Sequence, residues 1–395
     1  MLQSRVTSGK IAEIEVRIAD DRKGKGVFAK QRFRKNDVIF REKPIVCAQF
    51  LWNEYYKYSA CDHCMKSLET AEEMARRLSA ISSLVLPYPQ CCEVKKDEHV
   101  SCPACQTQYC STKCKEDAEK LYHRVLCMGQ HPADPEHPIA KLQDIWRNMH
   151  FPPETASIML IAKMIAKIKQ APDKSEAVAA FSQFRRATVN EEADITHKLL
   201  GEEFQGDIDM LLPFLNEALK EETVSHWFTS EGIRSLFALI GTNGQGVGTS
   251  SLSVYVHNCD ALDLNTDDRQ RLDLFIDQLY VDIEKESGSF LNCEGSALYS
   301  LQSCCNHSCV PNAEVTFPDN DAAVSVMALQ DIQENEEICI SYLGECDIGR
   351  SRHSRQKILR ENYLFNCNCM KCQSQCDDAD VTSDEDEEEM EEDSN

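Results

Sequence analysis

Eight consecutive residues, Asn306–Ala313, combine more chemical functions than an ordinary turn requires. They carry two side-chain amides, an imidazole and a thiol, and Pro311 fixes one backbone angle among them. About sixty residues later, a Cys-x-Cys-x2-Cys run supplies three more thiols, one short of a tetrahedral zinc site. The thiol of Asn306–Ala313 would complete that site and tie this segment to the end of the chain. The four predicted ligands are Cys309, Cys367, Cys369 and Cys372.

A short predicted strand that ends on a tyrosine lies between these two motifs. Residues Glu337–Ser341 are rich in isoleucine and lead directly into Tyr342. Together, Asn-His-Ser-Cys-x-Pro-Asn, Ile-Ser-Tyr and Cys-x-Cys-x2-Cys resemble the core SET and post-SET segments of protein-lysine methyltransferases. A polar turn capped by proline is the simpler alternative, but such a turn requires neither a particular cysteine nor a distant tyrosine.

The resemblance implies a site that transfers a methyl group from S-adenosylmethionine to a lysine. It implies that Asn306 and His307 hold the cofactor and that Phe365 packs on the adenine ring. Tyr342 is expected to be the catalytic residue and to contact the cofactor. With Tyr363 it is expected to line a narrow apolar channel, where desolvation beside a cationic sulfonium favours a neutral target amine.

A glycine-containing turn is predicted between two strands near the start of the sequence. Residues Ile11–Ile18 alternate apolar and charged side chains, as a half-buried strand does, and Asp20–Ala29 supplies the turn. The turn also matches the dinucleotide pattern G-x-G-x-x-A, but that pattern requires a helix next, and the following residues favour a strand. In SET proteins such a turn lets the backbone approach the cofactor closely. The resemblance therefore implies cofactor contacts at Lys23, Gly24, Lys25 and Gly26.

Eight cysteine and histidine residues between positions 61 and 127 are spaced as ligands for two tetrahedral zinc ions. The segment resembles a MYND finger, although a gap of 37 residues, 65–101, follows the first pair. Cys91 and Cys92 lie in this gap and are alternative ligands, and a helix is expected over Leu68–Leu78. The interleaved pairing implied by the resemblance assigns Cys61, Cys64, Cys110 and Cys114 to one ion, and Cys102, Cys105, His123 and Cys127 to the other.

The middle of the chain is predicted to be a helical insertion. Residues Glu154–Lys169 carry isoleucines at helical spacing after two prolines that can open a helix. Residues Thr242–Gly248 are too rich in glycine for the interior of a helix or strand and are predicted to form a loop. Asn243 in this loop is loosely similar to an asparagine that many SET proteins place beside the substrate. Further helical patterns include Ile195, Leu199 and Leu200, and the ranges Leu211–Leu219, Ile233–Leu239 and Asp267–Ser287.

Composition limits the partners and the location of the protein. The net charge is −24, and residues 377–395 contain twelve carboxylates without any lysine or arginine. Such an acidic chain is unsuited to direct duplex DNA binding, which requires phosphate neutralisation, and suits a basic protein substrate. The 21 cysteines cluster at short gaps, which indicates metal binding in a reducing compartment. Because no apolar run could span a membrane and no secretory signal is recognisable, a cytoplasmic and/or nuclear location is expected.

The predicted fold class is α+β, with a SET β-core split by a zinc-binding MYND finger and a helical insertion. A post-SET zinc site and a disordered acidic tail are expected to follow. The predicted boundaries are 1–60 for the N-terminal part of the SET core, 61–127 for the finger, 128–290 for the helical insertion with its glycine-rich loop, 291–345 for the core SET segment, 346–376 for the post-SET segment and 377–395 for the tail.

The predicted function is S-adenosylmethionine-dependent protein-lysine N-methylation. The expected substrates are histone H3 or H4 tails, as for a chromatin regulator, or another basic protein such as a ribosomal protein. The expected cofactors are S-adenosyl-L-methionine and three Zn²⁺ ions, in a monomer without membrane contact. The alternative is an inactive SET scaffold that acts as an adaptor or corepressor and binds proline-rich peptides through the finger. Tyr342 and the Asn-His pair argue against it, because an adaptor needs neither.

Overall fold

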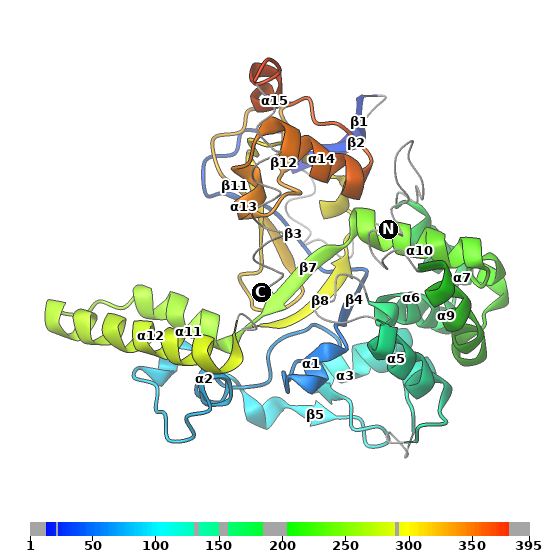
Figure 1. Ribbon diagram of the computed structural model, residues 1–395, viewed down its shortest axis with the longest axis horizontal. Helices are drawn as coiled ribbons and strands as arrows, with labels where there is room; N and C mark the ends of the chain where they lie inside the picture. The colour runs from blue at the N-terminus through cyan, green and yellow to red at the C-terminus, as the bar shows by residue number, and fades with distance from the viewer. Residues whose placement is uncertain are drawn as a thin grey trace.

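The computed structural model describes residues 13–20, 23–129, 134–149, 157–184, 204–288 and 292–378. Small β-sheets occupy the centre of the molecule, and groups of helices extend from them on two opposite sides (Figure 1). This mixture of helices and sheets agrees with the predicted class. Within the described ranges, no helix has the length and apolar character that crossing a bilayer requires.

One sheet brings together segments that are about 300 residues apart in sequence. β1 (Ile14–Asp20) and β2 (Gly24–Ala29) form an antiparallel hairpin. β12 (Glu337–Ile340) pairs antiparallel with β2 and parallel with β9 (Asn306–His307). The predicted turn is therefore shorter than expected, because residues 24–29 belong to a strand. Because β2 and β9 pair with opposite edges of β12, the glycine-containing segment and the Asn-His pair lie on either side of that strand.

A second sheet shares its apolar core with the first. Its strand order is β10-β11-β3, and both pairings are antiparallel. Val27 of β2, Phe40 of β3 and Ile338 of β12 are fully buried in one cluster. Each such side chain contributes about 1.5–3 kcal/mol of hydrophobic stabilisation, so the core fixes how the two sheets meet. The strand bounds are β3 (Val38–Glu42), β10 (Ala313–Thr316) and β11 (Val324–Ala328).

The glycine-rich segment Thr242–Gly248, which was predicted to be a loop, contains the end of a helix and most of an edge strand. β7 (Gln245–Thr249) pairs antiparallel with β8 (Cys293–Leu298), and β8 pairs on its other side with β4 (Val46–Gln49). Val247 points into the core, and the glycines on either side of it are exposed. Main-chain hydrogen bonds to β8 stabilise an extended backbone that the residue types alone do not favour. The loop prediction was wrong because strand pairing is a non-local interaction.

The helices of the middle of the chain form a bundle on one side of the sheets (Figure 1). Its central helix, α6, is almost entirely buried, which explains its continuous run of apolar residues. Helix α6 begins at Ile158, after the N-cap Ser157, and the predicted start Glu154 lies outside the described residues, as do Ile195, Leu199 and Leu200. The bundle contains α5 (Pro138–Met149), α6 (Ile158–Gln170), α7 (Lys174–Ser182), α9 (Phe204–Leu219) and α10 (Ser230–Asn243).

Three helices form an arm on the opposite side of the sheets (Figure 1). Helix α2 (Ala71–Ser79) starts with a capping box between Thr70 and Glu73, three residues after the predicted start. It packs on α11 (Ser251–Asp260), which the sequence did not predict, and on α12 (Thr266–Ser287), which it did. The 65–101 gap therefore supplies part of a helical layer.

The remaining elements are short, and most of them lie in the two stretches of sequence that carry the predicted metal ligands. They include a two-stranded ribbon in residues 61–127 and a helix, α14, that follows the tyrosine at the end of β12. Residues 379–395, most of the predicted acidic tail, lie outside the described residues. The bounds are α1 (Trp52–Tyr55), β5 (Val100–Ser101), β6 (Gln108–Tyr109), α3 (Thr112–Ala118), a π-helical turn at Glu119–His123, α4 (Arg124–Leu126), α13 (Glu345–Ile348), α14 (Arg352–Tyr363) and α15 (Met370–Ser374).

Candidate active site

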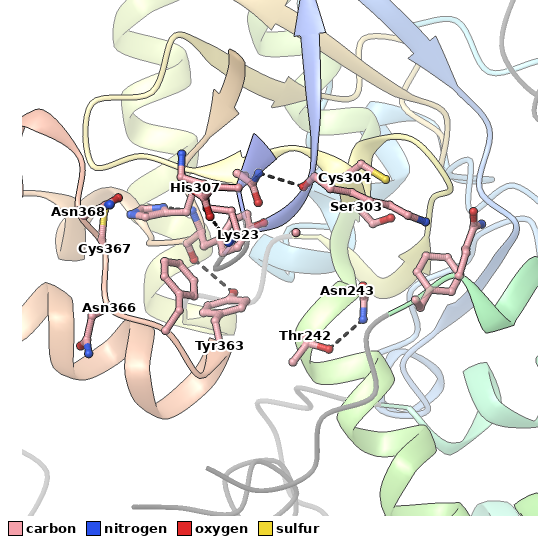
Figure 2. Close-up of a pocket in the computed structure, with 18 of the residues that line it drawn as sticks. Lys23, Thr242, Asn243, Ser303, Cys304, His307, Tyr363, Asn366, Cys367 and Asn368 are labelled. Carbon is pink, nitrogen blue, oxygen red and sulfur yellow. Dashed lines mark hydrogen bonds between the residues drawn. The ribbon is translucent and has the colours of Figure 1, made fainter. Parts of the chain in front are cut away.

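A cavity of about 490 Å³ lies where the first sheet, the end of α10 and the segment after α14 meet. Figure 2 shows Tyr363 and Asn366 on one side of this cavity, with Thr242 and Asn243 on the other. Of the ten residues predicted to bind cofactor or substrate, nine line the cavity. They are Lys23, Gly24, Lys25, Asn243, Asn306, His307, Tyr342, Tyr363 and Phe365.

The tenth residue, Gly26, lies behind the cavity wall and provides space for other side chains. A Cβ atom at this position would lie 2.8 Å from Glu337 Oε1 and 3.1 Å from Asn306 Nδ2. Both distances are shorter than ordinary van der Waals contacts. Gly26 is therefore required by the packing of its neighbours rather than by a contact with the cavity.

A carboxylate that the sequence analysis did not identify connects two of the predicted cofactor residues. Glu337, the first residue of β12, forms an ion pair with Lys23 at 2.8 Å. Its other oxygen accepts a hydrogen bond from Asn306 Nδ2 at 2.7 Å. The pKa of Lys23 is raised, because its hydrogen bond and ion pair with Glu337 outweigh the opposing effect of burial.

His307 is buried and links the tyrosine strand to the C-terminal cysteines. Its Nδ1 accepts a hydrogen bond from the Tyr342 main-chain amide at 3.0 Å. Its Nε2 lies 3.3 Å from Cys309 Sγ. Both ring nitrogens therefore have partners within the protein. These two contacts hold the imidazole ring in a fixed orientation in the cavity wall.

Aromatic rings form one wall of the cavity. The ring centroids of Tyr342 and Tyr363 are 4.8 Å apart, and Phe365 meets Tyr342 edge-on at 6.2 Å. The Tyr342 hydroxyl donates a hydrogen bond to the Cys305 carbonyl at 2.7 Å, and the Tyr363 hydroxyl donates to the Tyr342 carbonyl at 3.3 Å. Burial raises the pKa of both phenols, so both remain protonated at physiological pH.

Helix α10 and the segment before Asn306 form the opposite wall. Asn243, at the end of α10, donates hydrogen bonds to the Leu239 carbonyl at 2.9 Å and to the Thr242 hydroxyl at 2.8 Å. The segment before Asn306 is held by Glu42, a buried carboxylate that accepts main-chain N–H groups of Ser300–Gln302 at 2.8–3.0 Å. Glu42 is the last residue of β3, so this strand holds the part of the wall that precedes Asn306.

Three groups of thiol and imidazole side chains can each hold a metal ion. Within each group all ligand atoms lie within 4.8 Å of one another. The Sγ–Sγ separations of 3.5–3.9 Å are close to the roughly 3.8 Å expected around a zinc ion with bonds of about 2.3 Å. Three donor sets of this kind fit three Zn²⁺ ions. The groups are Cys61, Cys64, Cys110 and Cys114; Cys102, Cys105, His123 and Cys127; and Cys309, Cys367, Cys369 and Cys372.

The structure does not use the alternative ligands Cys91 and Cys92. Cys91 is buried in the apolar cluster of the helical arm, and Cys92 packs against the same cluster. Neither belongs to a metal-ligand group among the described residues. Asp62, between the first pair of ligands, forms an ion pair at 2.9 Å with Lys163 of α6, so this pair is also anchored to the bundle.

Polar side chains of α14 support the group formed by Cys309, Cys367, Cys369 and Cys372, here called the C-terminal cluster. Gln356 accepts from the Cys367 main-chain amide at 2.7 Å and donates to the same residue's carbonyl. Arg355, fully buried, places Nη2 3.6 Å from Cys372 Sγ. Four thiolates around Zn²⁺ carry a net negative charge, which this guanidinium offsets. The same helix ends at Tyr363, so the C-terminal cluster and the cavity wall share one support.

Several cavity residues had no recognisable signal in the sequence. Gln183, Phe184 and Ser303 reach the cavity from segments in which the sequence analysis identified no site residue. Glu337 was visible as the start of a strand, but its role depends on strand pairing. Asp20, Thr242, Ser300, Cys304, Asn366, Cys367 and Asn368 complete the lining.

Comparison with known proteins agrees with this geometry. The family model described as SET domain matches residues 24–343. The protein-lysine N-trimethyltransferase SMYD5 of Gallus gallus is 61% identical over 374 residues, which cover 95% of this chain and 89% of that protein. The human protein of the same name is 59% identical over 372 residues, or 94% of this chain and 89% of that protein.

More distant proteins are also similar to this chain. Histone-lysine N-methyltransferase ASHR1 of Arabidopsis thaliana is 24% identical over 355 residues, which cover 89% of this chain and 53% of that protein. The domain match covers residues 24–343, and each of the two high-identity relatives aligns with at least 94% of this chain. The chain therefore belongs to the SET domain family and, within it, to the SET and MYND domain-containing protein-lysine methyltransferases.

Proposed function

We propose that this protein trimethylates a lysine of a basic protein, with S-adenosylmethionine as the methyl donor. The observation that carries the proposal is that residues from segments far apart in the sequence line one cavity, namely residues within 20–25, 183–184, 242–243, 300–307 and 363–368, together with Tyr342. The names of the high-identity relatives support trimethylation as the product. The substrate classes are a histone H3 or H4 tail and a ribosomal protein, because a chain of net charge −24 attracts basic partners.

The cavity fits the two ends of the proposed cofactor. Lys23 and Lys25 supply positive charge for a carboxylate, and Asn306 supplies an amide oxygen for an ammonium group. Phe365 supplies an apolar face for the adenine ring. When bound, S-adenosylmethionine supplies a methyl group on an electrophilic sulfonium. The role of the chain is then to hold the amine in line with that methyl group and to exclude water.

Tyr342 is suited to orient the target amine. Because its hydroxyl proton is donated to Cys305, the phenolic oxygen is left to accept an N–H from the amine. That contact directs the amine lone pair away from the tyrosine and toward the methyl group. The aromatic rings of Tyr342 and Tyr363 desolvate the lysine, whose reference pKa is about 10.4, and so favour its neutral form.

The test is transfer of radiolabelled methyl groups from S-adenosylmethionine to separate pools of core histones and ribosomal proteins. We expect one labelled band, and mass spectrometry of that band should find a lysine carrying three methyl groups. The matched control is Tyr342→Phe, which keeps the aromatic ring and should not label the band. If the wild-type protein labels no basic protein in either pool, the proposed function is wrong, and the adaptor alternative becomes the better explanation.

A further inference from the structure

Glu337 uses both carboxylate oxygens to connect residues that come from opposite ends of the sequence. Oε2 lies 2.8 Å from Lys23 Nζ, and Oε1 accepts from Asn306 Nδ2 at 2.7 Å. The Glu337 side chain is only 18% exposed, so solvent weakens these contacts less than it would at an open surface. The two partners lie on either side of β12, and Glu337 is the group that joins them.

This arrangement determines which atom of Asn306 faces a ligand. The two hydrogens of Asn306 Nδ2 are donated to the Lys25 carbonyl at 3.0 Å and to Glu337. The amide orientation is therefore fixed, and Oδ1 remains as the acceptor. Within the described part of the chain, no protein donor bonds to this oxygen. Lys23 Nζ has two further hydrogens after its bond to Glu337, and its side chain lines the same cavity.

Two other motif residues act through Glu337. Asn312, the last asparagine of the Asn-His-Ser-Cys-Val-Pro-Asn motif, donates to the Glu337 carbonyl at 2.8 Å and accepts from the Cys339 amide at 2.8 Å. Asn312 therefore fixes the main chain of β12 from Glu337 to Cys339. Gly26 provides the space for Glu337 Oε1, since any Cβ there would lie 2.8 Å from this oxygen.

We propose that Glu337 is a positioning residue for the amino-acid end of the methyl donor. It holds Lys23 where the ammonium meets the carboxylate of the ligand, and it holds Asn306 with Oδ1 toward the ammonium of the ligand. This inference rests on the proposed function, because it assumes a ligand that carries both charges. The opposing explanation is that Glu337 competes with the ligand carboxylate for Lys23, in which case its removal would strengthen binding.

The charge-neutral variant Glu337→Gln separates these explanations. A carboxylate accepts at both oxygens, whereas an amide accepts at one end and donates at the other. The variant therefore cannot satisfy Lys23 and Asn306 together. Two probes are titrated into the full-length protein by calorimetry: S-adenosylhomocysteine, which has the amino-acid end, and 5′-methylthioadenosine, which lacks it. Zinc content and thermal unfolding establish that the variant is folded.

We expect Glu337→Gln to weaken S-adenosylhomocysteine binding by about 10- to 100-fold, the usual cost of a lost charged hydrogen bond. Binding of 5′-methylthioadenosine should stay within about twofold of wild type. Equal weakening of both ligands would reduce Glu337 to a structural role and overturn the proposal. Unchanged or tighter S-adenosylhomocysteine binding would also overturn it. If the wild-type protein binds neither probe, the proposed function itself fails.

Two further variants make the result specific. Glu336→Gln removes the neighbouring carboxylate, which contacts Asn312 and the Gln333 amide but neither Lys23 nor Asn306. It should leave the ratio of the two affinities unchanged. Gly26→Ala keeps the Glu337 carboxylate but displaces its flexible end, so it should reproduce the selective loss. If Gly26→Ala leaves S-adenosylhomocysteine binding intact, the position of the Glu337 carboxylate does not determine the affinity for the amino-acid end, and the proposal is wrong.

Discussion

The Tyr342 hydroxyl donates a hydrogen bond to the Cys305 carbonyl over 2.7 Å, immediately before the Asn306–His307 strand. One hydrogen bond thus joins the end of β12 to the segment that enters β9. It also commits the phenolic proton, which leaves the oxygen lone pairs for a substrate amine. The same contact therefore has a structural part and a proposed catalytic part, and these two parts can be separated by experiment.

Replacing Tyr342 with phenylalanine should abolish most methyl transfer without unfolding the protein. We expect kcat to fall by roughly 10²- to 10³-fold, as when one preorganised catalytic donor or acceptor is deleted. The Cys305 carbonyl loses its partner, so the free energy of unfolding should fall by about 1 kcal/mol. Single-turnover kinetics and urea unfolding measure the two effects. Methyl transfer at the wild-type rate would mean that Tyr342 is purely structural.

The three ligand groups should hold three zinc ions per chain. Plasma emission spectroscopy of the purified protein gives the ratio directly. Cys372→Ser should remove one ion and most of the activity, because the C-terminal cluster supports the wall that carries Tyr363 and Phe365. Two ions in the wild-type protein would show that one of the groups does not bind zinc.

Arg355→Met should accelerate zinc loss from the C-terminal cluster. The variant removes a fully buried guanidinium next to Cys372 Sγ, and partners of this kind contribute roughly 10- to 100-fold to metal affinity. When zinc is released to a chromogenic chelator, one of the three ions should be lost in a fast phase and the other two more slowly. Arg124→Met is the control, because Arg124 is exposed although it follows the predicted ligand His123. Equal release rates in both variants would exclude this role for Arg355.

Truncation after Cys376 should weaken capture of a basic protein without changing the chemistry. Residues 377–395 carry twelve carboxylates, whose attraction extends over a Debye length of about 8 Å at physiological salt. We expect a higher KM for a basic protein, a difference that disappears at high salt, and unchanged turnover on a short peptide. Equal KM values with and without the tail would make it a solubility device.

The metal-ligand residues could be predicted from the sequence because they lie in short, regularly spaced runs, and the resemblance to a MYND finger implied how those of residues 61–127 are paired. Spacings such as Cys61-x2-Cys64 allow little freedom in how thiols converge on one ion. The structure brings together the same sets of four side chains, including Cys309 with the distant C-terminal run. Nine of ten predicted cavity residues also meet, because the resemblance identified them as parts of one site.

The sequence alone determined the ligand chemistry and several amphipathic helices, since these follow from local spacing, and its resemblance to SET proteins supplied the cavity residues. Only the tertiary structure decided that Thr242–Gly248 contributes a strand, because the ladder with β8 outweighs the conformational preference of glycine. Likewise, only the pairing of β12 with β2 and β9 brings Glu337 between Lys23 and Asn306. Contacts across 31 and 314 residues depend on where the whole chain folds, and no local pattern encodes them.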